Sequence, residues 1–183
     1  LLSRRQRQMC IRDSMKTIHL MVGIQGSGKT TLAKKLSSAL VAKIVSTDEV
    51  RKTFPMIDEK FIWPKVYEMC AKELINGKDV IFDATSITPK VRKRLFENVS
   101  LYTTDFEVGC YYLDVPIHIC KKRVEKRNKI ADELYLPIEV IDSYNAKLIA
   151  PSVDEGYIFI KIYDENLNLI KELKSVSYTH LRA

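Results

Sequence analysis

A glycine-rich segment near the start of the chain, Gly23 to Thr30, constrains the possible folds more than any other feature. It reads Gly-Ile-Gln-Gly-Ser-Gly-Lys-Thr. A mainly apolar run at 16–22 precedes it and predicts a strand, and residues 29–40 follow with leucines on one face of a predicted helix. The glycines let successive backbone N–H groups turn toward one anion, and the helix adds its positive end. The full pattern predicts a phosphate-binding loop and not a chance glycine-rich turn.

The polar side chains of this loop indicate how a nucleotide would be held. Lys29 can reach the β- and γ-phosphates, and the Thr30 hydroxyl can ligate Mg²⁺. We therefore expect ATP and Mg²⁺ as ligands. The residues expected to contact the nucleotide are Gly23, Gln25, Gly26, Ser27, Gly28, Lys29, Thr30 and Thr31.

The rest of the chain alternates predicted strands with predicted helices. This alternation is typical of an α/β fold in which helices cover both faces of a parallel sheet. The remainder after residue 163 is interpreted as short and polar. Further strands are expected at 42–45, 79–82, 106–113 and 157–163, and helices at 48 onward, 65–75, 88–98, 116–127 and 137–148.

Length and composition narrow the class of protein. The chain of 183 residues predicts one domain, and it holds no apolar run of 18 or more residues that would predict a membrane span. No signal peptide is recognised, and the cysteines show no Cys-x-x-Cys spacing. Both observations favour a reducing cytoplasm as the location, and the spacing argues against a structural zinc site. The four cysteines are Cys10, Cys70, Cys110 and Cys120.

The two ends differ in character from the rest of the chain. Residues 1–14 and 176–183 resemble translated adapter sequence, so we expect a single native domain at 15–175 that begins at Met15. The formal net charge is +7, of which residues 1–14 contribute +3 and Arg182 contributes +1, which leaves +3. A mildly basic domain suits an anionic substrate, but it does not by itself indicate nucleic acid.

Two acidic residues follow predicted strands, as the glycine-rich loop does. Ligands of parallel sheets bind beyond the carboxyl ends of the strands, so Asp48 and Asp83 are expected beside the loop. Asp48 can accept the proton of an attacking hydroxyl, and Arg51, one helical turn later, can hold an anionic group on the acceptor. The alternative is a helix-capping Asp48 with a solvated Arg51. Asp83 ends an apolar strand in the manner of a Walker B acid and can hold Mg²⁺ through water; the alternative is a turn-capping carboxylate.

The predicted helix after Pro116 is strongly basic. Arg123 and Arg127 are four residues apart and share one face, and their guanidinium groups suit a phosphoryl group in transfer. We expect a small lid near 123–137, whereas the lysines of this helix are interpreted as a solvated face. Trp63 with Tyr67 can stack a base or simply pack a helix. The histidines are predicted to be non-catalytic.

The order of these motifs resembles a known family. The loop, Asp48-x-x-Arg51, Asp83-Ala-Thr and Arg123-x-x-x-Arg127 are similar to the kinase domain of phage-type polynucleotide 5′-hydroxyl kinases. They also resemble the broader P-loop kinase group of stand-alone ATP-binding proteins, the AAA-33 and zeta-toxin-like proteins. The resemblance covers about 15–163.

The resemblance implies both a fold and a set of roles. The fold would be a three-layer αβα P-loop NTPase with a five-stranded parallel sheet in the order 2-3-1-4-5. Asp48 would be the general base, Arg51 would bind the phosphate of the acceptor, and Arg123 and Arg127 would act on the ATP phosphates from the lid. The implied reaction is transfer of the γ-phosphate of Mg·ATP to a polynucleotide 5′-OH.

Three departures from the family pattern leave the acceptor open. Ser86 stands where Asn is usual, Gln25 where Pro is common, and Thr47 where a basic residue often precedes the acid. None of these positions is needed for ATP binding. A small-molecule or nucleotide-sugar kinase is therefore an alternative, and so is an ATP-binding switch that hydrolyses ATP slowly.

Overall fold

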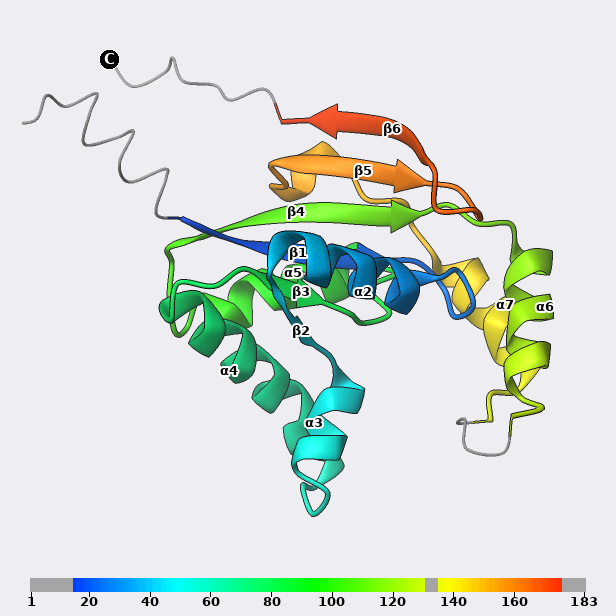
Figure 1. Ribbon diagram of the computed structural model, residues 1–183, viewed down its shortest axis with the longest axis horizontal. Coiled ribbons are helices and arrows are strands. Elements are labelled where there is room, and N and C mark those ends of the chain that lie inside the picture. Colours follow the sequence, from blue (N-terminus) through cyan, green and yellow to red (C-terminus); the bar gives the residue numbers. More distant parts are fainter. Residues whose placement is uncertain (1–14, 131–134, 176–183) are drawn as a thin grey trace, which may run out of the picture.

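The computed structural model describes residues 15–130 and 135–175, and it contains one six-stranded sheet with helices on both faces (Figure 1). The strand order is β2-β3-β1-β4-β5-β6. The first five strands are parallel, and β6 runs antiparallel to β5. The strands are β1 (Lys16–Val22), β2 (Lys43–Val45), β3 (Val80–Phe82), β4 (Phe106–Leu113), β5 (Phe159–Tyr163) and β6 (Leu169–Lys174).

The helices lie between the strands in sequence, as expected for parallel strands. None of those in the described part of the chain is long and apolar enough to cross a membrane. The expected segments 1–14 and 176–183, and 131–134 of the expected lid, lie outside the described residues. The α-helices are α2 (Lys29–Leu40), α3 (Thr47–Thr53), α4 (Ile62–Ile75), α5 (Pro89–Val99), α6 (Ile117–Arg127) and α7 (Ile138–Lys147), and the 3₁₀ helices are η1 (Glu59–Phe61) and η2 (Val153–Glu155).

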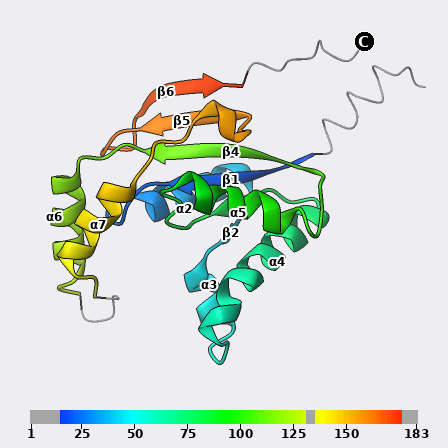
Figure 2. The ribbon, with the colours of Figure 1, turned by 180° about the vertical axis from the view of Figure 1, so that it is seen from behind.

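Two hydrophobic cores, one on each face, hold the layers together. Successive side chains of a strand point to opposite faces, so Ile18 and Leu20 of β1 pack with α4 and α5. Met21 of the same strand packs on the other face with α2, α6 and α7. The views from front and back show α4 and α5 covering one face and α2 the other, with α6 and α7 at the end where β4 finishes (Figure 2). The α/β P-loop NTPase fold is thus confirmed.

The strand count differs from the prediction of five. Residues 169–174, which the sequence places in a short polar remainder, form β6, which pairs with the edge of β5. Five of its six residues are exposed, so the sequence carries no alternating pattern that would reveal a strand. A turn at 164–168 joins the two strands, in which a carboxylate oxygen of Asp164 accepts backbone N–H groups from Asn166 and Asn168.

Helix starts near the sheet edge are fixed by side-chain caps. Ser46 caps α3, because its hydroxyl accepts the backbone N–H of Glu49 at 3.0 Å. Asp48 is therefore not the cap of this helix, which removes one of its two interpretations. Thr88 caps α5 as predicted, through Val91 N–H at 3.3 Å.

A buried ion pair joins α5 to the segment that follows α7. The Arg92 side chain is completely buried and donates two hydrogen bonds of 2.7 Å to Glu155. It also donates to the carbonyl oxygens of Ser86 at 3.1 Å and Ile149 at 2.9 Å. The Tyr157 hydroxyl completes the network by donating to Glu155 at 3.1 Å. The network holds the loop after β3 against the connection between α7 and β5.

Removing the guanidinium should destabilise the protein strongly. In Arg92→Met the carboxylate of Glu155 loses its partner in a largely buried position, so we expect a loss of about 3–5 kcal/mol in the free energy of unfolding. Urea denaturation monitored by circular dichroism measures this loss. The double variant with Glu155→Gln should recover part of it. Unfolding of Arg92→Met at the wild-type urea midpoint would contradict the assignment.

The same pair makes a pH-dependent contribution. Burial would raise the pKa of Glu155, but hydrogen bonds from Arg92 and Ser152 outweigh it and hold the pKa below the ordinary value of 4.5. The stabilisation is therefore complete above pH 4.5 and is lost as the pH falls through the lower, folded-state pKa.

Candidate functional site

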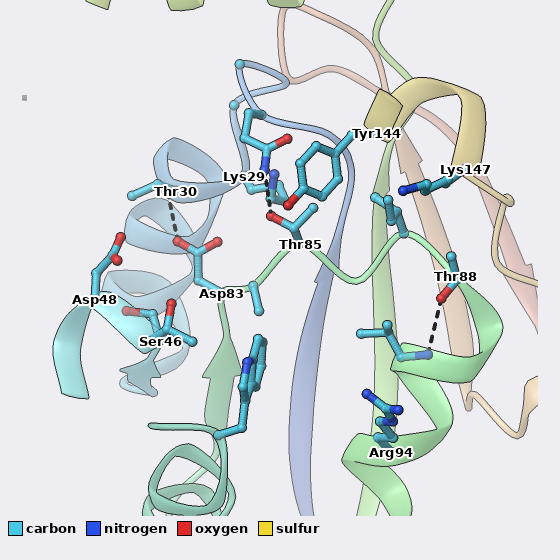
Figure 3. A pocket seen from close by; sticks show the side chains of 18 of the residues that line it. Lys29, Thr30, Ser46, Asp48, Asp83, Thr85, Thr88, Arg94, Tyr144 and Lys147 are labelled. Atoms are coloured by element: carbon cyan, nitrogen blue, oxygen red, sulfur yellow. Dashed lines mark hydrogen bonds between the residues drawn. The ribbon is translucent and has the colours of Figure 1, made fainter. Parts of the chain in front are cut away.

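A cleft of about 1170 Å³ opens at the carboxyl ends of the parallel strands. The segments that follow β1, β2 and β3 contribute to its wall the glycine-rich loop, Asp48 at the start of α3, and Asp83. Helices α4, α5, α6 and α7 supply the remaining sides, and Figure 3 shows Arg94 of α5 and Lys147 of α7. The structure thus brings the predicted acids and the phosphate-binding loop to one sheet edge.

The glycine-rich loop packs tightly against the start of α6. Gly26 has a φ of +80° and Gly28 a φ of +104°, a backbone region that residues with side chains rarely adopt. A Cβ atom on Gly26 would collide with the backbone carbonyl of Cys120. Gly23 and Ser27 are absent from the cleft wall and lie behind it, where a Cβ atom on Gly23 would lie 2.7 Å from the Ser27 hydroxyl oxygen. These contacts fix the shape of the loop.

Lys29 is a nearly buried cation at the floor of the cleft. Its side chain is 8% exposed, and Nζ donates to the carbonyl oxygen of Ile24 at 2.8 Å. Burial lowers the pKa of Lys29 to about 8, although the negative charge of Asp83 opposes the shift. A bound anion would replace the solvation that this ammonium group has lost.

Thr30 and Asp83 place two oxygen ligands side by side. The Thr30 hydroxyl donates to a carboxylate oxygen of Asp83 at 2.8 Å (Figure 3). The backbone N–H of Asp83 donates to Val45, which fixes the acid next to the end of β2. Within 15–130 and 135–175 no cluster of three or more His, Cys, Asp or Glu side chains is found. A hydroxyl and a carboxylate oxygen suit Mg²⁺, which keeps several waters and binds phosphate oxygens with only one or two protein ligands.

Asp48 and Arg51 occupy different environments. The Asp48 side chain is 79% exposed and lines the cleft. Arg51 does not line the cleft; it donates two hydrogen bonds of 3.0 Å to Glu59 and one of 3.3 Å to Asp48. Its guanidinium is thus turned toward two carboxylates of its own chain.

The two arginines of α6 also differ. Arg123 donates to the carbonyl oxygens of Gly26 and Ser27, each at 3.2 Å, and to that of Glu165 in the β5–β6 turn. It therefore ties the phosphate-binding loop to that turn. Arg127 lines the cleft, and its buried Nε has no hydrogen-bond partner among the described residues.

The remaining polar residues of the loop connect it with the cleft. The Gln25 amide donates to the Thr85 hydroxyl at 3.3 Å, which joins the loop to the segment after β3. Thr31 lines the cleft one residue beyond Thr30. His19 is buried in β1 beside Tyr111, and His118 is exposed; neither lines the cleft.

The sequence did not predict the residues that line the far wall of the cleft. Arg94 on α5 and Tyr144 and Lys147 on α7 line it, and their sequence context holds no motif that distinguishes them from ordinary surface residues. The sequence left two roles open for Trp63 and Tyr67, stacking on a base or packing of a helix. The structure places the two side chains in different environments. Both line the cleft, but Tyr67 is buried and stacks on Phe82, with ring centroids 6.3 Å apart, whereas Trp63 remains 40% exposed.

Comparison with known proteins agrees with this geometry. The AAA_33 family, described as an AAA domain, matches residues 18–151, and the chain belongs to this family. No curated protein matches the chain in sequence. The sequence-based resemblance to this P-loop kinase group is therefore confirmed.

Solved structures show the same fold at low sequence identity. An unliganded sugar kinase from Janibacter sp. is 22% identical with a TM-score of 0.60, over 83% of this chain and 86% of that one. A chain of the Pnkp1/Rnl/Hen1 RNA repair complex is 22% identical with a TM-score of 0.64, over 73% of this chain and 44% of that one. Kti12 from Chaetomium thermophilum, in complex with ADP-AlF3, is 15% identical with a TM-score of 0.58, over 74% and 81%.

A pair of glycine variants can test whether the close contact of Gly26 with Cys120 shapes the phosphate-binding loop. Gly26→Ala should displace the phosphate-binding loop and lower the affinity for ADP at least tenfold, as measured by calorimetry. Gly77→Ala is the control, because Gly77 has a φ of +75° but open space around it. The control should lose about 1–2 kcal/mol of stability and keep its affinity for ADP. Equal affinities in the two variants would show that the contact with Cys120 does not shape the loop.

Proposed function

We propose that this protein transfers the γ-phosphate of Mg·ATP to a hydroxyl group. The observation that carries the proposal is the arrangement of one cleft, in which Lys29 and the Thr30–Asp83 pair lie on the same edge as the exposed carboxylate of Asp48. A phosphate-binding floor and a free acid are the two parts that phosphoryl transfer to a hydroxyl requires. A switch that only hydrolyses ATP needs no acid for an acceptor.

The nucleotide and the metal would be held by the loop and its neighbours. The backbone N–H groups of the loop and the N-terminus of α2 suit the β- and γ-phosphates, and Lys29 adds its charge. Thr30 and Asp83 would hold Mg²⁺. When bound, Mg²⁺ neutralises the charge that develops on the phosphate oxygens.

Asp48 suits the role of general base. Its carboxylate would take the proton of the acceptor hydroxyl as the oxygen–phosphorus bond forms and the bond from the γ-phosphorus to ADP breaks. The hydrogen bond from Arg51 orients this carboxylate, whose exposed side faces the cleft. Arg127 would stabilise the transferring group from the side of α6, while Arg123 holds the loop in place.

The proposed acceptor is a polynucleotide 5′-OH. In support, the exposed Trp63 gives the cleft an aromatic surface on which a base can stack, and residues 15–175 are mildly basic. A small metabolite or nucleotide sugar fits the same chemistry and is the alternative outcome of the experiment below.

One prediction of this proposal concerns the pH dependence of ADP binding. The pKa of Lys29 is about 8 in the free protein, so above that pH its amine is mostly neutral. Binding of an anion then requires that Lys29 take up a proton. The affinity for ADP should be highest near pH 7, where the terminal phosphate is ionised and Lys29 is protonated, and should fall up to tenfold per pH unit above 8. Calorimetry from pH 6 to 9.5 measures it. Lys29→Met should bind ADP weakly with no such decline; a wild-type affinity that stays flat to pH 9.5 would contradict the buried-lysine account.

The second prediction concerns the reaction itself. The full chain, Mg²⁺ and γ-labelled ATP are offered a 5′-hydroxyl oligonucleotide beside a mixture of nucleosides and sugars, with Lys29→Ala as the blank. Label should appear on the oligonucleotide. The affinity of the protein for the oligonucleotide should fall steeply as the salt concentration rises. Asp48→Asn should lose transfer at least a hundredfold while its affinity for ATP stays near wild type.

Each of the other results has a definite meaning. Label only on small compounds keeps the kinase and discards the polynucleotide. Slow ATP hydrolysis that no hydroxyl compound changes would favour the switch. Normal turnover by Asp48→Asn would remove this residue as the base.

A further inference from the structure

Gln25 of the phosphate-binding loop and Thr85 of the segment after β3 meet inside the cleft. The side-chain amide of Gln25 donates to the Thr85 hydroxyl oxygen at 3.3 Å, and both residues are half-buried and line the cleft. Thr85 lies two residues after Asp83, whose carboxylate accepts the hydrogen bond from Thr30. The Gln25–Thr85 pair therefore lies next to the position that we propose for the terminal phosphate and its metal ion.

Each member of the pair keeps an unused hydrogen-bonding group. The side-chain oxygen of Gln25 is shielded from solvent and has no hydrogen-bond partner among the described residues. The Thr85 hydroxyl accepts from Gln25, and no acceptor for its own proton is found within 15–130 and 135–175. A buried acceptor without a partner is unfavourable and uncommon in folded proteins. Its presence in the wall of a cleft indicates a partner that arrives with a ligand.

A neutral hydroxyl group is complementary to this pair. It can donate one hydrogen bond to the Gln25 oxygen and accept another from the Thr85 hydroxyl. A phosphate oxygen only accepts, so it would leave the Gln25 oxygen unpaired beside a negative charge. Exchange of the amide oxygen and nitrogen would reverse the existing bond and still leave one donor and one acceptor. The last torsion angle of a glutamine is soft, so a small rotation presents the free amide atom to a ligand in the cleft.

The side chain that approaches the pair from the opposite wall is also uncharged. Tyr144 is half-buried, lines the cleft, and points from α7 toward Thr85 and Lys29 (Figure 3). Its ring offers an apolar face to the carbon skeleton of a ligand, and its phenol adds a neutral polar group. Neutral polar groups on a partly aromatic wall orient a ligand through its hydroxyl groups and not through its charge.

Resting on the proposed kinase function, we propose that Gln25 and Thr85 bind a second hydroxyl group of the acceptor, besides the one that is phosphorylated. The acceptor is therefore a ribose or another sugar. At a polynucleotide end the second hydroxyl is the 2′-OH of the first ribose, because the 3′ oxygen is esterified. In a free sugar it is a ring hydroxyl.

This assignment makes Gln25 and Thr85 specificity-determining residues. An acceptor that lacks the second hydroxyl leaves both the donor and the acceptor of the pair without a partner, and such a mismatch discriminates strongly between substrates. The pair thus favours RNA over DNA ends, or a sugar over its deoxy analogue. Proline, which is common at position 25 in similar proteins, has no side-chain group that could form either bond.

The test compares acceptors that differ in one hydroxyl group. The full chain, with saturating Mg·ATP, is offered a 5′-OH oligodeoxythymidylate whose first nucleotide is either uridine or 2′-deoxyuridine. It is offered glucose and its 2-, 3- and 4-deoxy analogues separately. In the set that is used, wild-type kcat/KM should be at least about tenfold higher for the fully hydroxylated acceptor than for one of its deoxy forms. The set that is used identifies the source of the hydroxyl.

Three variants locate the preference in the pair. Gln25→Met and Thr85→Val remove the hydrogen bonds at nearly constant side-chain size, and each should bring the ratio of the two kcat/KM values close to one. Both acceptors are measured on the same variant, so an altered affinity for ATP cancels from the ratio. Thr85→Ser is the matched control, because it keeps the hydroxyl and should keep the wild-type ratio. A ratio that stays at the wild-type value in both Gln25→Met and Thr85→Val would overturn the inference.

A binding measurement separates this inference from the kinase proposal. With ADP and Mg²⁺ present, calorimetry should show that wild type binds the hydroxylated acceptor at least about tenfold more tightly than the deoxy form, and that Thr85→Val binds both alike. This result without transfer to any acceptor would keep the hydroxyl site and remove the kinase. Transfer to both forms with equal kcat/KM would keep the kinase and overturn the site. Binding of none of these acceptors would overturn the site as well.

Discussion

The burial of Lys29 is the constraint around which the site is built. An ammonium group that has lost its water is unfavourable, and here one carbonyl oxygen and a nearby carboxylate offset only part of that cost. The two hydrophobic cores on the faces of the parallel sheet stabilise the fold that carries this cost. An anion bound in the cleft, as we propose for the terminal phosphates of ATP, would recover this energy at the Lys29 ammonium group. Thr30, the next residue, then presents its hydroxyl to Asp83 without any further adjustment.

The second residue on which the site depends is Arg92, whose hydrogen bonds stabilise the wall of the cleft that faces away from Lys29. Its hydrogen bonds to Ser86 and Ile149 hold the loop after β3 against the chain that leaves α7. The backbone N–H of Ile149 also donates to Ile87, so the end of α7 is fixed to the start of α5 from both sides. Arg94 and Lys147 are carried by these two helices. Their separation is therefore set by a buried network and not by the surface side chains themselves.

Most of the fold could be predicted because its signals are local. The loop at 23–30, the run at 106–113 that became β4 to the residue, and Thr88 as the cap of α5 each depend on neighbouring residues. β6 could not be predicted, since an exposed edge strand has no buried face to impose alternation. The ties of Arg123 to Glu165, and of Arg92 to Glu155, join residues far apart in sequence, and only the folded chain shows that these arginines are engaged.

The candidate site divides in the same way. The glycine-rich loop was predictable, because its shape depends on a backbone conformation that favours glycine, and the glycines are visible in the sequence. The far wall of the cleft was not, because Arg94 and Lys147 resemble ordinary surface residues in the sequence, and only their placement on α5 and α7 shows that they line the cleft. The same holds for Arg51, whose carboxylate partner Glu59 lies in η1, beyond a turn that no spacing rule anticipates. A fold used for many acceptors keeps the loop that all of them share and varies the wall that each acceptor touches.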